Sequence, residues 1–218
     1  MQIKVTINDR GVITIPAALR NEFGLKANDE LIVERCDGGI LLRPAFSVAI
    51  EFYSETRVDE FASDEASIAP PPKPAAGAGN ARAAQRFFLD ANVLFLASNT
   101  ESNAARLVAA ANEQGVLLTC DLAVEEARKY LQGKRPALLP AFEELLATLE
   151  IAPSVLFPLP ISLSEQDAPL LCTAIRSKCQ FFVTADKQYF GEMYDQKVQE
   201  TEIISLLRLV EILGEPEV

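Results

Sequence analysis

The stretch Phe87-Phe88-Leu89-Asp90-Ala91-Asn92-Val93-Leu94-Phe95 sets one carboxylate, Asp90, into a mostly apolar run. An unpaired carboxylate is expensive to bury, so Asp90 is hard to explain as a surface residue. The apolar residues 87–89 predict a buried strand that ends at this acid. In an α/β sheet, functional groups gather at the carboxyl ends of the strands, and Asp90 stands in that position.

After residue 86, apolar runs suited to buried strands alternate with helical patterns. The patterns predict strands at 87–89, 116–120, 180–184 and 202–204, and helices near 101–114, 121–131, 136–148, 164–177 and 205–213. Such alternation predicts a parallel sheet covered by helices on both faces. Asp186 also directly follows an apolar strand run, which predicts that it lies at the same sheet edge as Asp90.

The composition is that of a globular, acidic protein of 218 residues, 49% hydrophobic, with 31 acidic against 20 basic residues and a net charge of −11. This charge disfavours a nonspecific nucleic-acid binder, because such binding rests on Lys and Arg. We expect a cytoplasmic protein with no membrane partner, since no leader or long apolar run is apparent. The four cysteines lack Cys-x-x-Cys spacing and are expected to be reduced core thiols.

The clearest seam is the Pro-, Ala- and Gly-rich stretch 67–80, which predicts a linker between two domains. Before it, alternating apolar residues at 3–7 and 12–15 flank the turn Asp9-Arg10-Gly11 and predict a hairpin. A short helix from Pro16 to Phe23 and strands at 30–35 and 39–42 are predicted to follow. A unit this small seldom has a stable monomeric core, so we expect it to dimerise.

The chain contains no histidine, which removes the usual general base and the usual zinc ligand. Hydrolysis would then depend on a hard cation such as Mg²⁺ or Mn²⁺ held by carboxylates, as in phosphodiester chemistry. Four acids within hydrophobic motifs are candidate ligands: Asp90, Glu126, Asp167 and Asp186. Ordinary structural interpretations also exist, because Ser164-x-x-Asp167 fits a capping box, Asp186 fits a helix cap and Glu126 fits a solvated helix face.

Residues 87–213 resemble a PIN domain, the metal-dependent ribonuclease fold of many bacterial toxins. The resemblance rests on Leu89-Asp90-Ala-Asn92, the helical Glu before Ala-Arg, Asp167-Ala-Pro-Leu-Leu, and Thr184-Ala-Asp186. It implies that Asp90, Glu126, Asp167 and Asp186 are catalytic and bind one or two Mg²⁺ or Mn²⁺ ions for cleaving RNA, with Asn92 and Thr184 supporting the pocket. Glu125 is an alternative to Glu126, since one helical step changes direction by about 100°. The stretch Lys187-Gln188-Tyr189 lacks the further acid that many family members carry, so the number of metals stays open.

Residues 3–43 resemble the AbrB/MazE-type swapped-hairpin domain, in which two chains interlace their strands into one barrel that grips operator DNA. The resemblance rests on 8–20, 24–30 and 38–44, which read NDRGVITIPAALR, GLKANDE and GGILLRP. It implies a DNA-binding dimer. Lys4, Arg10 and Arg20 are the candidate DNA-binding residues, with ordinary surface charge as the alternative for each.

Residues 50–66 look like the tail by which such antitoxins wrap their partner nuclease, with Arg57 as the candidate inhibitory residue facing the acid cluster. The whole chain resembles a VapBC-type antitoxin and toxin fused into one polypeptide. The implied domains are a swapped-hairpin domain at 1–48, a toxin-binding segment at 49–66, a linker at 67–86 and a nuclease at 87–218.

This organisation implies a metal-dependent RNA endonuclease that is restrained by its own antitoxin-like module, and that binds operator DNA as a homodimer or larger homo-oligomer. One alternative is a DNA-binding transcriptional regulator whose PIN module is catalytically inert. Another is an RNA-processing nuclease that uses the N-terminal barrel only to dimerise.

Overall fold

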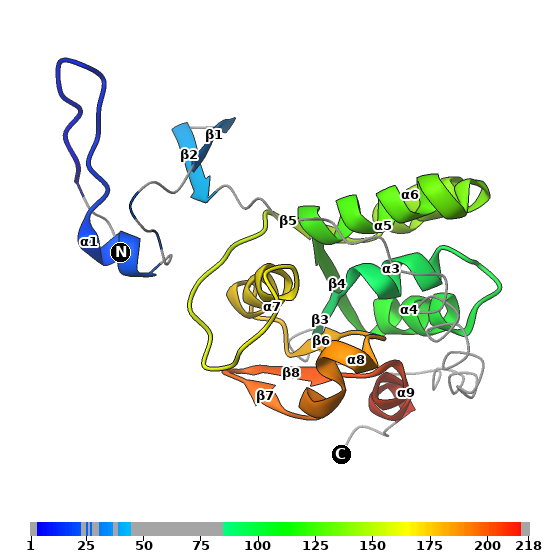
Figure 1. Ribbon diagram of the computed structural model, residues 1–218. Coiled ribbons are helices and arrows are strands. Elements are labelled where there is room, and N and C mark those ends of the chain that lie inside the picture. Colours follow the sequence, from blue (N-terminus) through cyan, green and yellow to red (C-terminus); the bar gives the residue numbers. More distant parts are fainter. Residues whose placement is uncertain are drawn as a thin grey trace.

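The computed structural model describes residues 4–22, 25, 27, 31–36, 39–44 and 85–214. Its N-terminal elements are α1 (Ala17–Glu22), β1 (Leu31–Cys36) and β2 (Gly39–Pro44). An α/β unit follows (Figure 1). Its elements are β3 (Gln85–Leu89), α3 (Ala91–Ala97), α4 (Asn103–Gln114), β4 (Gly115–Cys120), α5 (Asp121–Lys134), η1 (Pro136–Leu138), α6 (Leu139–Leu146), β5 (Glu150–Ala152), α7 (Asp167–Arg176), β6 (Phe181–Val183), α8 (Lys187–Phe190), η2 (Gly191–Met193), β7 (Lys197–Val198), β8 (Thr201–Ile204) and α9 (Leu206–Gly214).

The α/β unit is built on a six-stranded sheet with the strand order β5-β4-β3-β6-β8-β7. Its neighbouring strands pair in parallel, except that β7 runs antiparallel to β8. From β3 the chain builds outward to β4 and β5, and it then returns to the other side of β3 to form β6. The strand order therefore reverses between β3 and β6, and ligands of open α/β sheets bind beside such a reversal.

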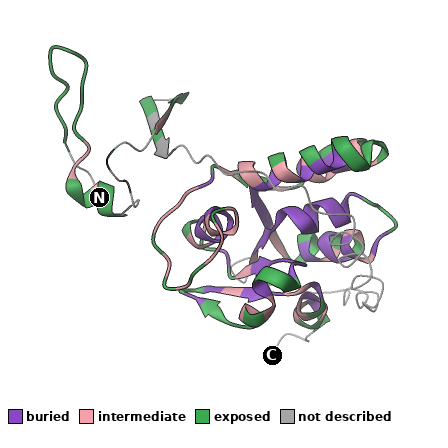
Figure 2. Cartoon of the chain, in the orientation of Figure 1, coloured by how far each residue is buried: buried purple, intermediate pink, exposed green. Residues whose placement is uncertain are grey.

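Helices cover both faces of this sheet, with α7 on one face and α3, α4 and α9 on the other (Figure 1). Every residue of α3 is buried. The central strands and α3 are coloured as buried in Figure 2, and the members of the core cluster lie within residues 87–213. The predicted α/β architecture with a mostly parallel sheet is thus confirmed.

The register of the two central strands aligns their carboxyl ends. Phe87 pairs with Phe181 and Phe88 with Phe182, and the rings of these two pairs stack with centroids 5.3 and 5.5 Å apart. Leu89 pairs with Val183 at the end of the ladder. The next residue of each strand, Asp90 and Thr184, therefore emerges at the same edge of the sheet.

Each strand predicted in the α/β part occurs with its ends shifted by at most two residues. Strand β3 begins at Gln85, ahead of the expected boundary at 87, and the helix predicted from 164 begins at Asp167. Helix α3 and the short elements β5, β7, α8 and η2 were not predicted. Helix α3 follows β3 without turn residues, and elements of two to four residues are too short to show a periodicity.

In the N-terminal part, the predicted short helix and the later two strands are present as α1, β1 and β2. The prediction of strands at 3–7 and 12–15 is wrong for the described residues, because 4–8 and 12–16 carry no strand. The turn between them does form: the Asn8 amide donates to the Val12 carbonyl over 3.0 Å, and Gly11 adopts φ +77°. One such bond does not make a ladder, and a strand needs a paired neighbour along its length.

Residues 45–84 lie outside the described residues, and with them the predicted toxin-binding segment, Arg57 and the predicted linker as far as residue 84; its last two residues, Gln85 and Arg86, belong to β3. Among the helices of the described residues, none combines the length and the apolar character needed to cross a bilayer.

Candidate active site

Asp90 is buried at the carboxyl end of β3, with 2% of its surface exposed. It caps α3, because its Oδ1 accepts a hydrogen bond from the Ala91 amide over 2.7 Å. Its own amide donates to the Val183 carbonyl of the neighbouring strand over 3.1 Å. The backbone therefore fixes Asp90 at the reversal of strand order.

Asn92 and Thr184 hold the second oxygen of this carboxylate. The Thr184 hydroxyl and the Asn92 side-chain amide each donate to Asp90 Oδ2 over 2.6 Å. The Asn92 amide also reaches Thr184 Oγ1 at 3.1 Å, while its carbonyl accepts from the Ala185 amide at 2.9 Å. All three side chains are at most 2% exposed, so the network is shielded from water. These residues thus occupy supporting positions around Asp90.

Asp186 lies two residues beyond Thr184 and is also buried. Its amide donates to Thr184 Oγ1 over 3.1 Å, which links it to the network around Asp90. Its Oδ1 accepts from the amides of Gln188 and Tyr189 at 3.0 and 3.2 Å. Asp186 is therefore the N-terminal cap of α8, as the structural interpretation of the sequence proposed, and it lies beside Asp90 at the same time.

Asp167 begins α7, the helix that covers one face of the sheet. Its Oδ2 accepts from the Ser164 hydroxyl over 2.7 Å, and its amide donates back to Ser164 Oγ over 3.0 Å. The capping relationship expected for Ser164-x-x-Asp167 is present in this form. Asp167 acts on Asp90 as well as capping α7, because its charge raises the pKa of the Asp90 carboxyl.

Glu126 and Glu125 have different environments on α5. Glu126 is partly buried. Glu125 is exposed and pairs with Lys129 across one helical turn, with 3.0 Å between Oε1 and Nζ. The geometry of the helix therefore favours Glu126 as the member of the acid cluster.

The charges of three other acids act on the Asp90 carboxyl. Burial raises the pKa of Asp90 well above its ordinary value, the Thr184 hydrogen bond opposes this, and the charges of Glu126, Asp167 and Asp186 raise the pKa further. Like charges near a buried carboxylate disfavour its ionised form unless a cation compensates. Glu126, Asp167 and Asp186 therefore lie near enough to Asp90 for their charges to act on it.

Carboxylate oxygens suit hard cations such as Mg²⁺ and Mn²⁺, so the donor chemistry of the cluster fits the metal that the resemblance implies. Within the described ranges, however, no group of three or more His, Cys, Asp or Glu side chains stands close enough together to hold a metal ion. The four acids therefore suit Mg²⁺ or Mn²⁺ by their chemistry and charge, and not by a preformed coordination shell.

Sequence reasoning missed Asp121, which follows the carboxyl end of β4 as Asp90 follows β3. Its Oδ1 accepts hydrogen bonds from the amides of Leu122 and Ser154 at 2.9 Å each and from the Ser154 hydroxyl. It also missed the Tyr194 hydroxyl, which donates to the Thr184 carbonyl over 3.3 Å. The position of Asp121 directly after a predicted strand was the available signal.

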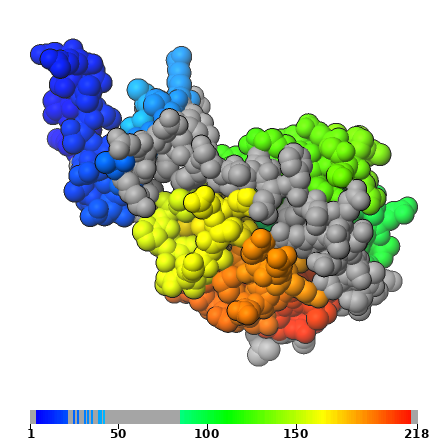
Figure 3. Space-filling view, viewed as in Figure 1, coloured from blue at the N-terminus to red at the C-terminus, as the bar shows by residue number. Residues whose placement is uncertain are grey.

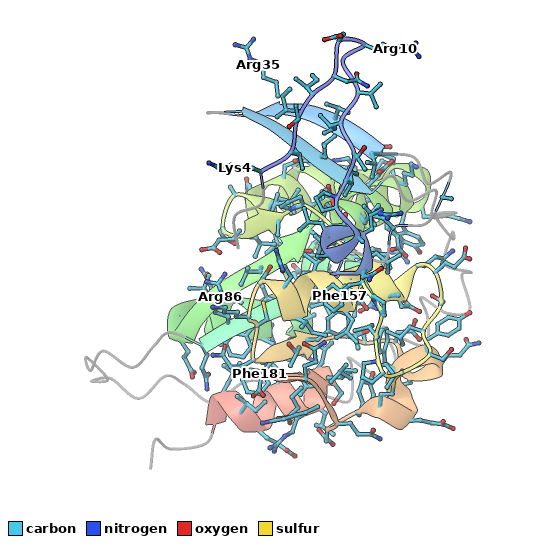
Figure 4. All side chains as sticks on the ribbon, turned by 90° about the vertical axis from the view of Figure 1, so that its left-hand side faces the viewer. Lys4, Arg10, Arg35, Arg86, Phe157 and Phe181 are labelled. Carbon is cyan, nitrogen blue, oxygen red and sulfur yellow. The ribbon has the colours of Figure 1, made fainter. Side chains whose placement is uncertain are left out.

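The predicted DNA-binding residues Lys4, Arg10 and Arg20 are all exposed in the N-terminal part. Lys4 and Arg10 project outward from the segment that contains the Asn8 turn (Figure 4). The described structure thus leaves these cations available at the surface, which is compatible with nucleic-acid contact and equally with ordinary surface charge.

Two solved structures with limited similarity to this chain are VapBC2 from Rickettsia felis bound to a DNA fragment from its promoter, and PAE2754 from Pyrobaculum aerophilum. The first is 12% identical, with a TM-score of 0.43 over 56% of this chain and 98% of that chain. The second is 18% identical, with a TM-score of 0.42 over 60% of this chain and 90% of that chain. No curated protein sequence matches the chain.

Residues 4–45 match the family profile described as antidote-toxin recognition MazE, bacterial antitoxin. The match spans α1, β1 and β2 together with the turn at Asn8. It agrees with the resemblance deduced from the sequence of residues 3–43. Over residues 4–45 the chain is therefore similar to the MazE family of bacterial antitoxins.

Proposed function

We propose that the α/β unit is a metal-dependent RNA endonuclease of the PIN type, and that the antitoxin-like module of the same chain restrains it. The observation that carries this proposal is the buried Asp90 beside the reversal of strand order, held by Asn92 and Thr184, with Glu126, Asp167 and Asp186 near enough for their charges to raise its pKa. Buried like charges are costly for a fold, which makes a cluster of this kind a candidate functional site.

The four carboxylates would hold Mg²⁺ or Mn²⁺. When bound, such an ion lowers the pKa of a water molecule and stabilises negative charge that develops on phosphate. The role of Asn92 and Thr184 is to fix Asp90 Oδ2 in one orientation. The amides of Gln188 and Tyr189 orient Asp186 in the same manner. A site with prearranged ligands does not need to reorganise when its substrate arrives.

The metal centre is tested by Mn²⁺ titration of the full-length protein and of the Asp90→Asn, Asp186→Asn double variant. We expect wild-type protein to bind Mn²⁺ and the double variant to lose this binding, since two of the four candidate ligands are neutralised. Asn retains the size of Asp, so the comparison isolates charge from packing. Equal Mn²⁺ affinity of the two proteins would exclude this cluster as the metal site.

The proposed restraint rests on the sequence of residues 50–66, which lie outside the described residues. A short flexible tether gives an effective concentration in the millimolar range, so the chain's own tail would occupy the nuclease site for most of the time. Arg57 would form charge-assisted hydrogen bonds with the acids. The full-length Arg57→Ala variant should then cleave RNA faster than wild type, and an unchanged rate would refute this inhibitory role.

We propose in addition that the N-terminal module dimerises and binds operator DNA. Apolar side chains are unusually exposed in this module, including Ile7 at 63%, Val12 at 56%, Val33 at 64% and Ile40 at 73%. A second copy would cover such residues and would double the set of exposed cations. The test is salt-dependent binding of the chain's own promoter fragment, which should weaken in an Arg10→Ala, Arg20→Ala variant that remains dimeric.

A DNA-binding regulator with an inert α/β module is the second candidate function. It is favoured by the lack of three acids in metal-binding proximity within the described part of the chain. The two candidates differ in one observable: only the nuclease requires Mn²⁺ binding that depends on Asp90.

A further inference from the structure

The segment between β5 and α7, residues 153–166, contains neither helix nor strand and leads directly into Asp167. Its first part is attached to the carboxyl end of β4, where Asp121 accepts hydrogen bonds from the amide and the hydroxyl of Ser154. Ser154 is only 3% exposed. An irregular segment with a buried, hydrogen-bonded beginning is held in place rather than free to move.

The middle of the segment is attached to α7 itself. The Val155 amide donates to Thr173 Oγ1 over 3.0 Å, and the Cys172 thiol lies 3.4 Å from the carbonyl oxygen of Phe157. Phe157 lies on this segment (Figure 4). In the space-filling view, the yellow surface of the segment borders the orange surface that includes α8 (Figure 3). These contacts fix the path of the segment along α7, up to the point where the segment leads into Asp167.

At its end, Ser164 makes two kinds of contact with α7. Its Oγ accepts from the amides of Gln166 and Asp167 at 3.2 and 3.0 Å, which is an ordinary helix-capping interaction. The same hydroxyl donates to Asp167 Oδ2 over 2.7 Å. The donated bond contributes nothing to satisfying backbone amides. Its effect is to fix the rotation of the Asp167 carboxylate.

We infer that Ser164 is a positioning residue, whose hydroxyl orients the Asp167 carboxylate for metal binding at the acid cluster. This inference rests on the proposed function of that cluster. Hydrogen bonds from an outer residue to a ligating carboxylate are typically worth about 10- to 100-fold in metal affinity. The tethered segment 153–166 supplies the hydroxyl from outside the helix, so the orientation of Asp167 does not depend on its own backbone alone.

The test compares Mn²⁺ affinity, measured by calorimetry on full-length proteins, for wild type, Ser164→Gly and Ser164→Thr. Glycine is nearly as good a helix cap as serine, so Ser164→Gly removes the hydroxyl at little cost to α7. We expect Ser164→Gly to bind Mn²⁺ about 10- to 100-fold more weakly, and Ser164→Thr to retain wild-type affinity because it restores the hydroxyl.

The matched control is Ser102→Gly. Ser102 caps α4 by accepting from the Ala105 amide at 3.0 Å and donates to the Leu96 carbonyl at 2.9 Å, so it has the same two kinds of contact without a carboxylate. Its replacement should leave Mn²⁺ affinity unchanged. Thermal unfolding without metal identifies any variant that fails to fold, and Ser164→Ala provides a second variant that lacks the hydroxyl.

The outcomes separate this inference from the proposed function. If wild type binds Mn²⁺ in a manner that depends on Asp90, and folded Ser164→Gly or Ser164→Ala binds it equally well, the positioning role is overturned while the metal centre stands. If wild type itself does not bind Mn²⁺, the proposed metal centre fails and the role of Ser164 fails with it.

Discussion

The Thr184 hydroxyl donates to Oδ2 of Asp90 over 2.6 Å, although the two residues are 94 positions apart in the sequence. The parallel pairing of Leu89 with Val183 brings them together, because each residue directly follows the paired end of its strand. The register of the two central strands therefore builds the centre of the candidate site.

Thr184→Val tests this relationship. Valine has the shape of threonine but lacks its hydroxyl, which donates a hydrogen bond to Asp90 and accepts one from the Asp186 amide. We expect a loss of about 1–3 kcal/mol in the free energy of unfolding, because a buried amide loses its partner. Mn²⁺ affinity should also fall by about 10- to 100-fold.

Thr201→Val is the control for this change. Thr201 is equally buried, and its hydroxyl donates to the Cys179 carbonyl over 2.8 Å at the start of β8. Its replacement should reduce stability by about 1 kcal/mol without changing Mn²⁺ affinity. Similar Mn²⁺ affinities of the two variants would contradict a specific role for Thr184.

Glu126→Gln should weaken Mn²⁺ binding by about tenfold or more, since it neutralises a carboxylate that acts on Asp90. Glu125→Gln is the matched control one residue away, and it breaks only an exposed pair with Lys129 that is worth less than about 1 kcal/mol. Calorimetric titration distinguishes the two. If Glu125→Gln lowers Mn²⁺ affinity more than Glu126→Gln does, the choice of Glu126 as the candidate ligand on α5 is wrong.

The strands and longer helices of the α/β unit were predictable because their apolar residues recur with a clear period. Phe87, Phe88 and Leu89 form a fully buried apolar run, and in the run Phe181–Val183 the last two residues are buried and Phe181 is partly buried. Helix α8 and strand β7 were not predictable, since four and two residues carry no periodic signal. The segments 4–8 and 12–16 show alternation without strand structure, because alternation alone does not supply a pairing partner.

The positions of the site residues could be predicted only in part. Asp90 and Asp186 follow apolar strand runs, so their approach to a common edge could be deduced from topology. The contact of Ser164 with Asp167 was visible as a capping pattern, but the hydrogen bond to the carboxylate depends on the path of residues 153–166. The contacts of Asp121 with Ser154 depend on the same path, and no sequence pattern encodes it.

Gly115→Ala should destabilise the fold, because Gly115 lies where β4 approaches β3. An added Cβ would meet the Gln85 carbonyl oxygen and would lie 2.9 Å from the Phe87 ring. Such overpacking typically costs about 1–3 kcal/mol. Gly133→Ala is the counterpart on α5, where nothing lies within 4 Å, and it should gain up to about 1 kcal/mol. Urea unfolding midpoints that shift in the same direction for both variants would contradict this account of packing.

The buried thiols should be unreactive in the native protein. Burial raises the pKa of Cys120 and of Cys179 from 9.0 to about 12, and that of Cys172 to about 11. In a Cys36→Ser background at pH 8, we expect negligible modification by a disulfide reagent until urea unfolds the chain. Fast modification of the folded protein would contradict the burial of these residues.

The same shifts set the sign of an alkaline effect on stability. Burial raises the pKa of the Cys120 thiol above its unfolded value of 9.0. Below pH 9 the thiol keeps its proton in both the folded and the unfolded state, so it does not make the free energy of unfolding depend on pH. Above pH 9 the unfolded chain loses protons first, so the free energy of unfolding should fall as the pH rises toward 12. Comparing wild type with a Cys120→Ala variant over this range isolates the contribution of one thiol.

The most direct test of the account is cleavage of a mixed RNA pool with Mn²⁺ or Mg²⁺ by three proteins: full-length chain, residues 81–218, and residues 81–218 carrying Asp90→Asn. The fragment retains the core cluster of the described residues, which lies within 87–213. We expect the fragment to cleave RNA, the full-length protein to cleave it much more slowly, and Asp90→Asn to abolish cleavage. A folded fragment that cleaves no RNA with either metal, or an Asp90→Asn fragment as active as its parent, would contradict the account.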